Sequence, residues 1–431
     1  MSVLATGWRV EPAAPLLGQL AVPADQSLAV RAILLSTLAA DGVRILGADP
    51  TAPLVANAIV AARALGCRVS EEPEGVVVHG RGGRLGVPAA ALQTLDDPAT
   101  ISLLGALAAR QSEGTYTLSG GRGTPTVAAV AILRAQGAEV IAGEEGLPFR
   151  IVAGAPPVAA DHVLPGGSDV LKLIGLVAGL AAGSTIVELA ASPDHAERML
   201  RSLGARLDRR GPRVTHVAPS TLRGGEIELP GDPDVAAAFV LAATLVPGST
   251  LYLTGVGANP GRSALISLLE RMGARIGTSG RRQTSAGETI VDLEVRSAEL
   301  VGSDIDEDLA LALGPQLPLA LIAVACARGR SRLRAEIQLD DEAVDRAARH
   351  LFAIGAHPRI TPQGLDVQGV PARVRGGDVA DLPGAGGALA FAVAGLYSES
   401  GVRIDDASAL DRDYPSFRPL VRALIAERSH P

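Results

Sequence analysis

Polar side chains stand at the starts of several apolar segments, where they could bind a small anion. Gln26, Ser27 and Arg31 open one such segment, and Asp97 and Thr100 open the next one. Hydroxyls and a guanidinium are groups that hold carboxylates and phosphates, and an aspartate beside them could transfer a proton. These starts are therefore the first places to look for a binding site.

A third segment start combines a hydroxyl, a carboxylate and the only lysine of the chain, in Ser168, Asp169 and Lys172. If the segments are helices, their first N–H groups lack partners and the positive end of the helix dipole favours an anion. Serine and aspartate also cap helices, so Asp97 and Asp169 have a purely structural explanation as well. Taken together, the starts suit a small molecule with several negative charges.

The elements that would position these starts come from an internal repeat. Six times an apolar segment ends at a glycine, and a short alternating strand follows. Glycine after the last turn is a common C-terminal cap of a helix. The spacing of 65–81 residues between these glycines indicates six copies of one supersecondary unit. The glycines are Gly42, Gly114, Gly183, Gly248, Gly329 and Gly401.

Each copy predicts a helix, a strand, a second and amphipathic helix, and one or two further strands, so the fold class is α/β. The first helix of each copy is apolar nearly all round, which is typical of a buried helix. We therefore expect two domains, each of three repeated βαβαββ-type units, with the apolar helices inside and the sheets outside.

Length, charge and cysteine content limit the partners of the chain. Its 431 residues suit two or three domains, and a net charge of −7 with 2% aromatic residues argues against nucleic acid. Two cysteines without metal-ligand spacing suit a reducing compartment, so we expect a cytoplasmic location. The apolar runs are shorter than the roughly 20 residues of a membrane span, and the N-terminus lacks a signal-peptide core. We expect a monomer that binds a small molecule, no membrane, no metal and no other cofactor.

Several longer motifs run through the whole chain in a recognisable order. They are VPADQSLAVRAILLSTLA (22–39), SPDHAERMLRSLGA (192–205), LPGDPDVAAAFVLAATLVPGS (229–249), GVGANPGRSALISLLERMGA (255–274) and DRDYPSF (411–417). On these motifs the chain resembles the enolpyruvyl transferase family, and within it the 5-enolpyruvylshikimate-3-phosphate (EPSP) synthases. The last four motifs are specific, and their order and spacing agree with the family.

The resemblance implies two three-repeat domains, with the active site in the cleft between them. Mapping the family's two-strand hinge places one domain at 25–231 and the other at 1–24 plus 232–431. The family joins the enolpyruvyl group of phosphoenolpyruvate to the 5-hydroxyl of shikimate 3-phosphate and expels phosphate. That reaction needs cations for two anions, together with an acid and a base.

Part of the family's acceptor site is retained. The resemblance assigns Ser27, Arg31 and Thr100 to the shikimate ring, and it assigns Ser168 and Ser192 to the phosphate of the acceptor. These residues imply that a cyclic carboxylate still binds to the chain.

Four further residues are candidate substrate contacts by position or charge. Gln26 stands where the family has a lysine, and Arg412 stands where it has another. The arginine that grips phosphoenolpyruvate is replaced by Thr124, and Arg122 is a possible substitute two residues away. Lys172 adds a cation in the third helix.

The phosphoenolpyruvate side of the family's site is largely replaced. Pro315 stands at the position of the catalytic aspartate, Leu339 at that of a catalytic lysine, and Ala343 and Gly386 at those of two arginines. Only an acid, Asp340, remains of the motif around Leu339. Each charge-assisted contact is worth roughly 1.5–3 kcal/mol, so these losses predict weak binding of phosphoenolpyruvate.

The acceptor residues are retained while most phosphoenolpyruvate residues are replaced, and this combination favours an elimination reaction on the ring. Our leading hypothesis is a lyase of secondary metabolism that removes water, or phosphate, from shikimate or its 3-phosphate. Asp169 would be the general acid, Asp340 or Asp97 the base, and Arg31 the clamp on the ring. Two alternatives stay open. One is a divergent 3-phosphoshikimate 1-carboxyvinyltransferase that uses phosphoenolpyruvate, and the other is a non-catalytic ligand-binding homologue.

Overall fold

The computed structural model describes residues 7–120, 124–142, 148–154, 158–164, 168–334, 341–370 and 372–426. The chain forms two compact units. Unit 1 consists of Met1–Pro23, Gly231–Arg282 and Ile290–Pro431, and unit 2 consists of Ala24–Pro230 and Gln283–Thr289. Each unit is described by itself below.

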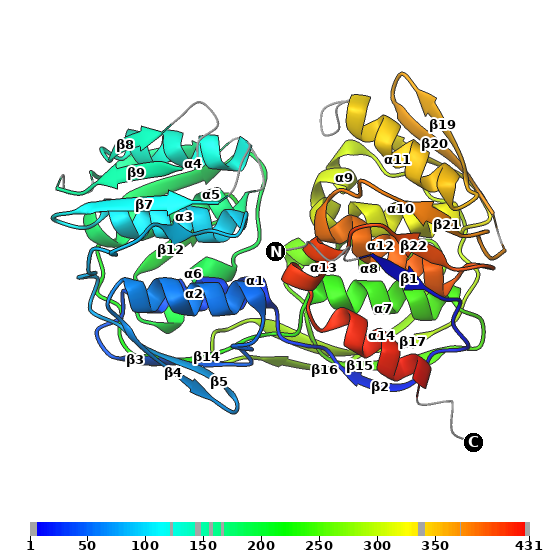
Figure 1. The fold of residues 1–431 in the computed structure, drawn as a ribbon, viewed down its shortest axis with the longest axis horizontal. Helices are drawn as coiled ribbons and strands as arrows, with labels where there is room; N and C mark the ends of the chain where they lie inside the picture. Colours follow the sequence, from blue (N-terminus) through cyan, green and yellow to red (C-terminus); the bar gives the residue numbers. More distant parts are fainter. Residues whose placement is uncertain are drawn as a thin grey trace. The chain divides into compact units, whose positions relative to one another are not determined.

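Unit 2 contains three copies of the repeat in sequence order (Figure 1). The first copy contains α1 (Gln26–Ser36), β3 (Gly42–Leu46), α2 (Pro53–Ala64), β4 (Arg68–Glu72) and β5 (Gly75–His79). The second contains β6 (Leu92–Gln93), α3 (Pro98–Ala109), β7 (Thr115–Ser119), α4 (Thr124–Ala135), β8 (Glu139–Ala142) and β9 (Phe149–Val152). The third contains β10 (Ala160–Leu164), α5 (Asp169–Ala182), β11 (Ser184–Glu188), α6 (His195–Ser202), β12 (Leu207–Arg210) and β13 (Val214–Val217), and β14 (Gly225–Glu228) follows.

Unit 1 repeats the same order of elements (Figure 1). It begins with β1 (Trp8–Val10) and β2 (Leu17–Ala21) and resumes with α7 (Pro233–Leu245), β15 (Thr250–Gly257), η1 (Pro260–Arg262), α8 (Ala264–Arg271), β16 (Arg275–Gln283) and β17 (Thr289–Arg296). Next come α9 (Glu307–Leu313), η2 (Gly314–Gln316), α10 (Leu317–Ala325), β18 (Gly329–Arg334), α11 (Asp341–Ala353), β19 (His357–Thr361) and β20 (Gly364–Gly369). The last elements are β21 (Gly377–Val379), α12 (Gly384–Leu396), β22 (Val402–Ile404), α13 (Ser408–Asp413) and α14 (Phe417–Ala426).

The sheets carry the signature of the repeat. In unit 2, β6 lies parallel to β7, and β9 and β8 then follow as antiparallel neighbours. The sheets β10-β11-β13-β12 and β14-β3-β5-β4 have the same pattern, as does β2-β15-β17-β16 in unit 1. A parallel pair needs a crossover connection, and the apolar helix of each copy supplies it, as α3 does between β6 and β7. The predicted α/β repeat fold is therefore confirmed.

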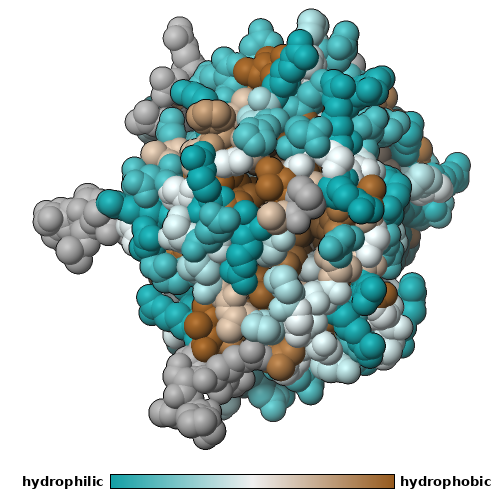
Figure 2. Space-filling view, turned by 90° about the vertical axis from the view of Figure 1, so that its right-hand side faces the viewer, coloured by the Kyte–Doolittle hydropathy of each residue, from teal (hydrophilic) through white to brown (hydrophobic). Residues whose placement is uncertain are grey.

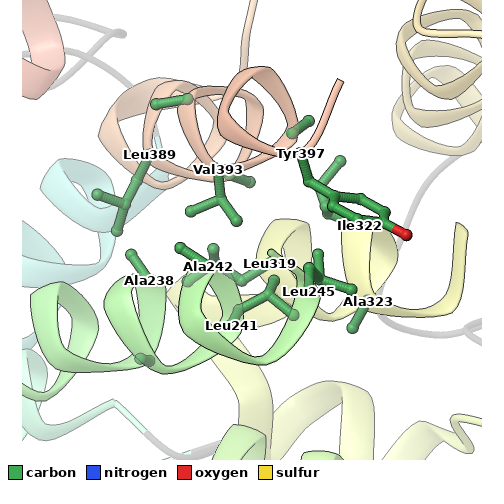
Figure 3. Close-up of a cluster of buried hydrophobic side chains, with 14 of the residues drawn as sticks. Ala238, Leu241, Ala242, Leu245, Leu319, Ile322, Ala323, Leu389, Val393 and Tyr397 are labelled. Carbon is green, nitrogen blue, oxygen red and sulfur yellow. The ribbon is translucent and has the colours of Figure 1, made fainter. Parts of the chain in front are cut away.

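The core of each unit is built around its apolar helices. In unit 1, α7, α10 and α12 pack against one another through small and branched side chains (Figure 3). Residues such as Leu241, Ile322 and Val393 are fully buried there, because these helices have no polar face to present to solvent. In unit 2, α3 packs against both α1 and α5. The starts of these six helices are fixed by this packing.

Two of the divisions between the units fall after Pro23 and after Pro230, beside the predicted hinge, and the domain bounds themselves stay a prediction. The tip of the β16–β17 hairpin, Gln283–Thr289, packs with unit 2 and not with unit 1. There the Ser285 hydroxyl accepts a hydrogen bond from the backbone N–H of Glu228 at 2.8 Å. The Glu288 carboxylate lies 2.8 Å from Nδ1 of His195. Residues 283–289, which the sequence assigned to the other domain, thus add an acid to unit 2.

Hydrophilic side chains dominate the face in Figure 2, and hydrophobic ones show mainly across its centre. Within the described residues, the run Glu307–Ala325 is long and apolar enough to cross a membrane, and 56% of it is buried in the protein. The run includes α10, which packs in the core of unit 1. A core helix meets the same criterion of length and hydropathy.

Candidate active site

The three helix starts of unit 2 are capped by their own side chains. The Asp25 carboxylate accepts a hydrogen bond from the N–H of Leu28 at 3.0 Å, and the Ser168 hydroxyl accepts one from Leu171 at 3.3 Å. Asp97 caps α3 in the same way. The capping explanation of Asp97 therefore holds.

Arg31 and Asp169 form an ion pair at the starts of α1 and α5. Nη1 of Arg31 lies 2.5 Å from a carboxylate oxygen of Asp169, and the exposed side-chain fractions are 6% and 17%. Burial alone would lower the pKa of Arg31, but Asp169 outweighs it and the pKa is raised. An ionised carboxylate that accepts from a guanidinium has no proton to give, so this geometry does not suit Asp169 as a general acid.

Gln26 and Thr100 are engaged with their own surroundings. The amide of Gln26 donates to the carbonyl of Ala24 at 2.8 Å and accepts from the N–H of Asp49 at 3.4 Å. The Thr100 hydroxyl donates to the Asp97 carboxylate at 2.6 Å. Ser27 is half-buried on α1. Gln26 thus stabilises the turn before α1, where the family's lysine would carry a charge.

Lys172 is fully buried inside unit 2. Its ammonium lies 2.9 Å from Glu197 and 3.3 Å from Glu188, and it donates to the carbonyl of Pro193 at 3.0 Å. Ser192 donates its hydroxyl to the same Glu188. Because Lys172 exposes none of its side chain, we assign it to the interior and not to a ligand surface.

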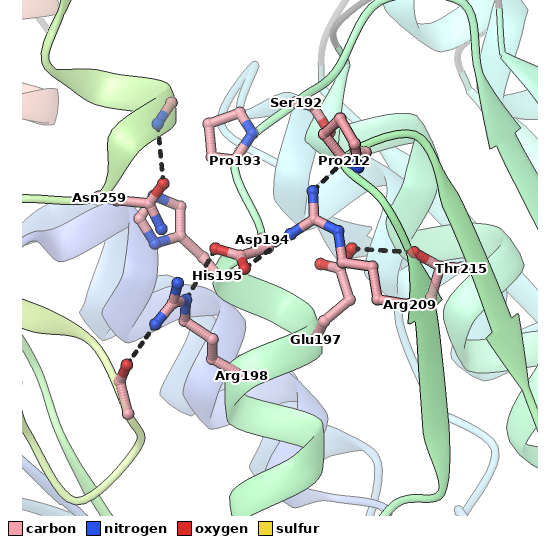
Figure 4. A network of polar contacts seen from close by, with 12 residues as sticks. Ser192, Pro193, Asp194, His195, Glu197, Arg198, Arg209, Pro212, Thr215 and Asn259 are labelled. Carbon is pink, nitrogen blue, oxygen red and sulfur yellow. Dashed lines mark hydrogen bonds and ion pairs between the residues drawn. The ribbon is translucent and has the colours of Figure 1, made fainter.

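The motif around α6 forms a second polar network (Figure 4). Asp194 accepts from Arg198 and Arg209 at 2.7 Å each, and His195 contacts Glu288. These side chains come from α6, β12 and the hairpin tip, so the network ties three segments of unit 2 together. The sequence motif could point to this region, but it did not reveal Glu188 or Glu288 as partners.

In unit 1, three of the four replaced positions of the family site line one pocket, and the fourth, Leu339, lies outside the described residues. Pro315, Ala343 and Gly386 meet around an apolar cavity of about 310 Å³. Phe391 and His350 also line it, with their rings 5.6 Å apart in an edge-on arrangement. Three of the losses read from the sequence therefore lie around one pocket, whose wall is mostly apolar and has Arg346 as its one arginine.

Backbone packing explains why position 386 carries glycine. A Cβ atom built on Gly386 would lie 2.6 Å from the carbonyl oxygen of Pro315, far inside van der Waals contact. The carbonyl of Pro315 occupies the space in which any side chain at 386 would begin. A side chain at position 386 thus requires the backbone at position 315 to move.

Asp234 organises the starts of the helices in unit 1. It accepts from Gln316 at 2.8 Å, from Arg262 at 2.7 Å and from the Tyr414 hydroxyl at 3.0 Å. Burial would raise the pKa of Asp234, but Arg262 and these hydrogen bonds outweigh it and the pKa is lowered. Burial, reinforced by Asp234, raises the pKa of Tyr414 well above its usual value. Three of the specific sequence motifs thus meet at one carboxylate.

The remaining predicted site residues are placed as follows. Arg412 forms a two-point ion pair with its neighbour Asp413 at 2.5 and 3.0 Å. Arg122 and Asp340 lie outside the described residues. Among the residues that the structure does describe, no three His, Cys, Asp or Glu side chains converge as a metal site.

Comparison with known proteins places this geometry among the enolpyruvyl transferases. Residues 10–420 match the family of EPSP synthase (3-phosphoshikimate 1-carboxyvinyltransferase), and the chain belongs to that family. A 3-phosphoshikimate 1-carboxyvinyltransferase of Acidithiobacillus ferrooxidans is 34% identical, with 97% of each chain covered. One from Gloeobacter violaceus is 34% identical over 95% of this chain and 96% of its own.

Solved structures agree with the family assignment. The EPSP synthase of Acinetobacter baumannii superposes with a TM-score of 0.84 at 26% identity, covering 97% of this chain and 98% of its own. The enolpyruvyl transferase NikO of Streptomyces tendae superposes with a TM-score of 0.75 at 18% identity and 96% coverage of both chains. The second likeness concerns the fold alone.

The lyase hypothesis is wrong. The curated relatives that share about a third of their residues with nearly the whole chain are named carboxyvinyltransferases, which supports the transferase alternative. The error came from giving the replaced residues more weight than the similarity of the rest of the chain. Asp169, which the hypothesis used as a general acid, is the ion-pair partner of Arg31.

Proposed function

We propose that this protein is a divergent 3-phosphoshikimate 1-carboxyvinyltransferase that uses phosphoenolpyruvate. The observation that carries the proposal is the 34% identity over 97% of the chain to relatives with that name. In the reaction, an ether bond forms between the ring hydroxyl and the carboxyvinyl carbon. The bond from that carbon to the phosphate oxygen breaks, and phosphate and a proton leave.

The acceptor side of the proposal rests on unit 2. Ser27, Arg31 and Thr100 lie on α1 and α3, whose starts offer N–H groups and the positive ends of helix dipoles. Arg31 is the group we assign to the ring, and Ser168 and Ser192 are those we assign to the phosphate. Binding of the acceptor requires Arg31 to exchange Asp169 for the ligand, which costs part of the binding energy.

The donor side of the proposal rests on fewer charges. Arg412 stands where the family has a lysine, and the mostly apolar pocket around Ala343 has one arginine, Arg346, which is paired with Glu342 at 3.6 Å. Phosphoenolpyruvate should therefore bind weakly, and we expect a high KM for it with a measurable kcat. This expectation separates the protein from relatives that keep their arginines.

The direct test is incubation of the full chain with phosphoenolpyruvate and shikimate 3-phosphate. We expect release of inorganic phosphate only when both ligands are present, together with the vinyl proton signals of an enol ether in the NMR spectrum. No phosphate release that depends on both ligands, even at high phosphoenolpyruvate concentration, would contradict the proposal.

A charge-neutral variant tests the role of Arg31 without leaving a buried charge behind. In Arg31→Gln/Asp169→Asn both members of the pair become amides, so the fold keeps a hydrogen-bonding pair of similar size. We expect kcat/KM for shikimate 3-phosphate to fall about tenfold or more, since a charge-assisted contact is lost. The control is Arg201→Gln on the exposed side of α6, which should leave the rate unchanged.

The cellular setting of the protein follows from the proposed reaction. We infer that it works as a cytoplasmic monomer on small-molecule substrates, as expected from the sequence. Both points stay predictions.

A further inference from the structure

Unit 2 contains a hollow of about 670 Å³ at the C-terminal ends of its three central helices. Leu38 follows the end of α1, Arg110 is the C-terminal cap of α3, and Leu180 lies in the last turn of α5, and all three line the hollow. The helices are 11–14 residues long, so the hollow lies about 16–21 Å along them from the starts described above. It is therefore separate from the candidate active site of unit 2.

Three arginines line this hollow, and no aspartate or glutamate does. They are Arg110, Arg206 and Arg223, and none of them forms an ion pair with a described residue. Ser220 and Thr221 add hydroxyl groups to the wall. Arginines and hydroxyls are a typical lining for a phosphate, and the neighbouring acid Asp41, which lies beside Gly224, does not line the hollow.

Arg110 is the most constrained of the three. Its side chain donates to the carbonyl of Val177, while its Nε is buried and has no hydrogen-bond partner. Burial lowers the pKa of Arg110, because no carboxylate offsets the desolvation. A half-buried cation without a counter-charge is costly, and an anion in the hollow would reduce that cost.

The C-terminal ends of the three helices do not carry enough negative charge to neutralise the three arginines. Each helix C-terminus is equivalent to roughly half a negative charge, so three of them offset about half of the charge of three arginines. The remainder is between one and two positive charges. A phosphate group, with one to two negative charges near neutral pH, balances it.

Unit 1 provides an internal comparison. It has a hollow of about 590 Å³ at the equivalent ends of α7, α10 and α12. That hollow is lined by Glu299, Cys326 and Tyr397, and Arg275 is its single arginine. The hollow is therefore a consequence of the repeat, whereas the arginine lining is a property of unit 2.

We propose that the arginine-lined hollow of unit 2 binds a small molecule through a phosphate or diphosphate group. The inference does not depend on the transfer reaction, because the site lies at the opposite ends of the helices and its occupancy is measured directly. Its ligand would stabilise the packing of α1, α3 and α5.

The test is calorimetric titration of the full chain with pyrophosphate, with acetate as the monovalent control. We expect one binding event that weakens as salt is added and that acetate does not reproduce. Hydrogen exchange should slow in residues 204–223 when pyrophosphate is present. No binding heat and no protection in this segment would overturn the proposal.

Variants locate the site. Arg206 and Arg223 are exposed, so Arg206→Gln/Arg223→Gln should keep the melting temperature and weaken pyrophosphate binding about tenfold or more. The control with the same change in net charge is Arg328→Gln/Arg359→Gln, at two exposed positions of unit 1, which should bind as before. Unchanged affinity in the first variant would overturn the proposal.

The active-site variant separates this site from the substrate site. Pyrophosphate binding should persist in Arg31→Gln/Asp169→Asn, whatever happens to its transferase activity. If that variant loses pyrophosphate binding while Arg206→Gln/Arg223→Gln keeps it, pyrophosphate binds at the substrate site and not in the hollow, and the proposal is wrong.

Discussion

The two units share an arrangement of three central helices, but they differ in the charged residues at the family's site positions. At the helix starts of unit 2, Arg31 remains and is neutralised by Asp169. In unit 1, the family's cations are absent at Ala343 and Gly386, and an apolar pocket takes their place. Unit 2 thus keeps Arg31 but pairs it with a carboxylate of its own. In unit 1, the arginines of the family are replaced by small residues that line a pocket.

This difference shows how a binding site changes while its fold persists. An internal ion pair can be broken by a ligand, so unit 2 keeps the ability to bind an anion at an added cost. The pocket in unit 1 is mostly apolar, with Arg346 as the one arginine on its wall, and a side chain at position 386 would collide with the Pro315 carbonyl, so the change there is difficult to reverse. We therefore expect substitutions in the Arg31–Asp169 pair to change affinity for the acceptor, and a side chain at position 386 to lower stability.

The largest effect should follow from Lys172→Met, which tests how far unit 2 depends on paired charges. The change leaves Glu188 and Glu197 buried together without their cation, which costs about 3–5 kcal/mol. Denaturant unfolding measures the loss. The triple variant Lys172→Met/Glu188→Gln/Glu197→Gln should recover a large part of it, and Arg201→Met on the same unit should stay within about 0.5 kcal/mol of wild type. Equal stability of the single and triple variants would show that the charges are not the cause.

Ala343→Arg tests whether the missing charge is what weakens the donor side. An arginine here faces the apolar pocket and adds one charge-assisted contact, worth roughly 1.5–3 kcal/mol, so KM for phosphoenolpyruvate should fall about tenfold or more. Steady-state kinetics at saturating acceptor measures it.

Gly386→Arg is the matched contrast at the opposite wall of the pocket. Its Cβ collides with the Pro315 carbonyl, so the backbone must shift. The melting temperature should therefore drop, and KM for phosphoenolpyruvate should not decrease. If Gly386→Arg instead restored phosphoenolpyruvate binding at full stability, the steric explanation of Gly386 would be wrong.

Asp169→Ser tests the paired-charge account of unit 2. Ser168 and not Asp169 caps α5, so the variant keeps the cap; it also frees Arg31, so shikimate 3-phosphate should bind about tenfold more tightly. Calorimetry measures the change. In the Arg31→Gln background the same substitution should have almost no effect, because the interaction energy belongs to the pair. An equal gain in both backgrounds would show that Asp169 acts on the ligand directly.

Much of the fold could be predicted from the sequence because its signals are local. The apolar helices, their glycine ends and the alternating strands recur six times, and each copy folds by the same rules of capping and burial. The hairpin tip at residues 283–289 could not be assigned, because its place depends on contacts such as that between His195 and Glu288, which are 93 residues apart.

The site was predictable in position but not in pairing. The sequence located Arg31 and Asp169 at separate helix starts, yet their ion pair spans 138 residues and has no local signal. Likewise, the sequence shows that Lys172 is the only lysine but not that two glutamates enclose it. Three of the replaced positions of unit 1 were each visible, whereas their convergence on one cavity required the structure.

The smallest expected effect is a pH dependence that compares one buried histidine in each unit. Burial lowers the pKa of His162 in unit 2 and of His350 in unit 1. A lowered folded-state pKa means that the unfolded chain binds more protons below about pH 6.5, so this stability is present above that pH and is lost as pH falls toward the folded pKa. His350→Gln removes the titration and can still donate to the Ala380 carbonyl, which His350 Nε2 contacts at 2.8 Å. The melting temperature of this variant should therefore fall less than that of wild type between about pH 7.5 and 5.5, and His162→Gln should behave in the same way through unit 2. If either variant loses as much stability as wild type over this range, protonation of that histidine is not what destabilises its unit.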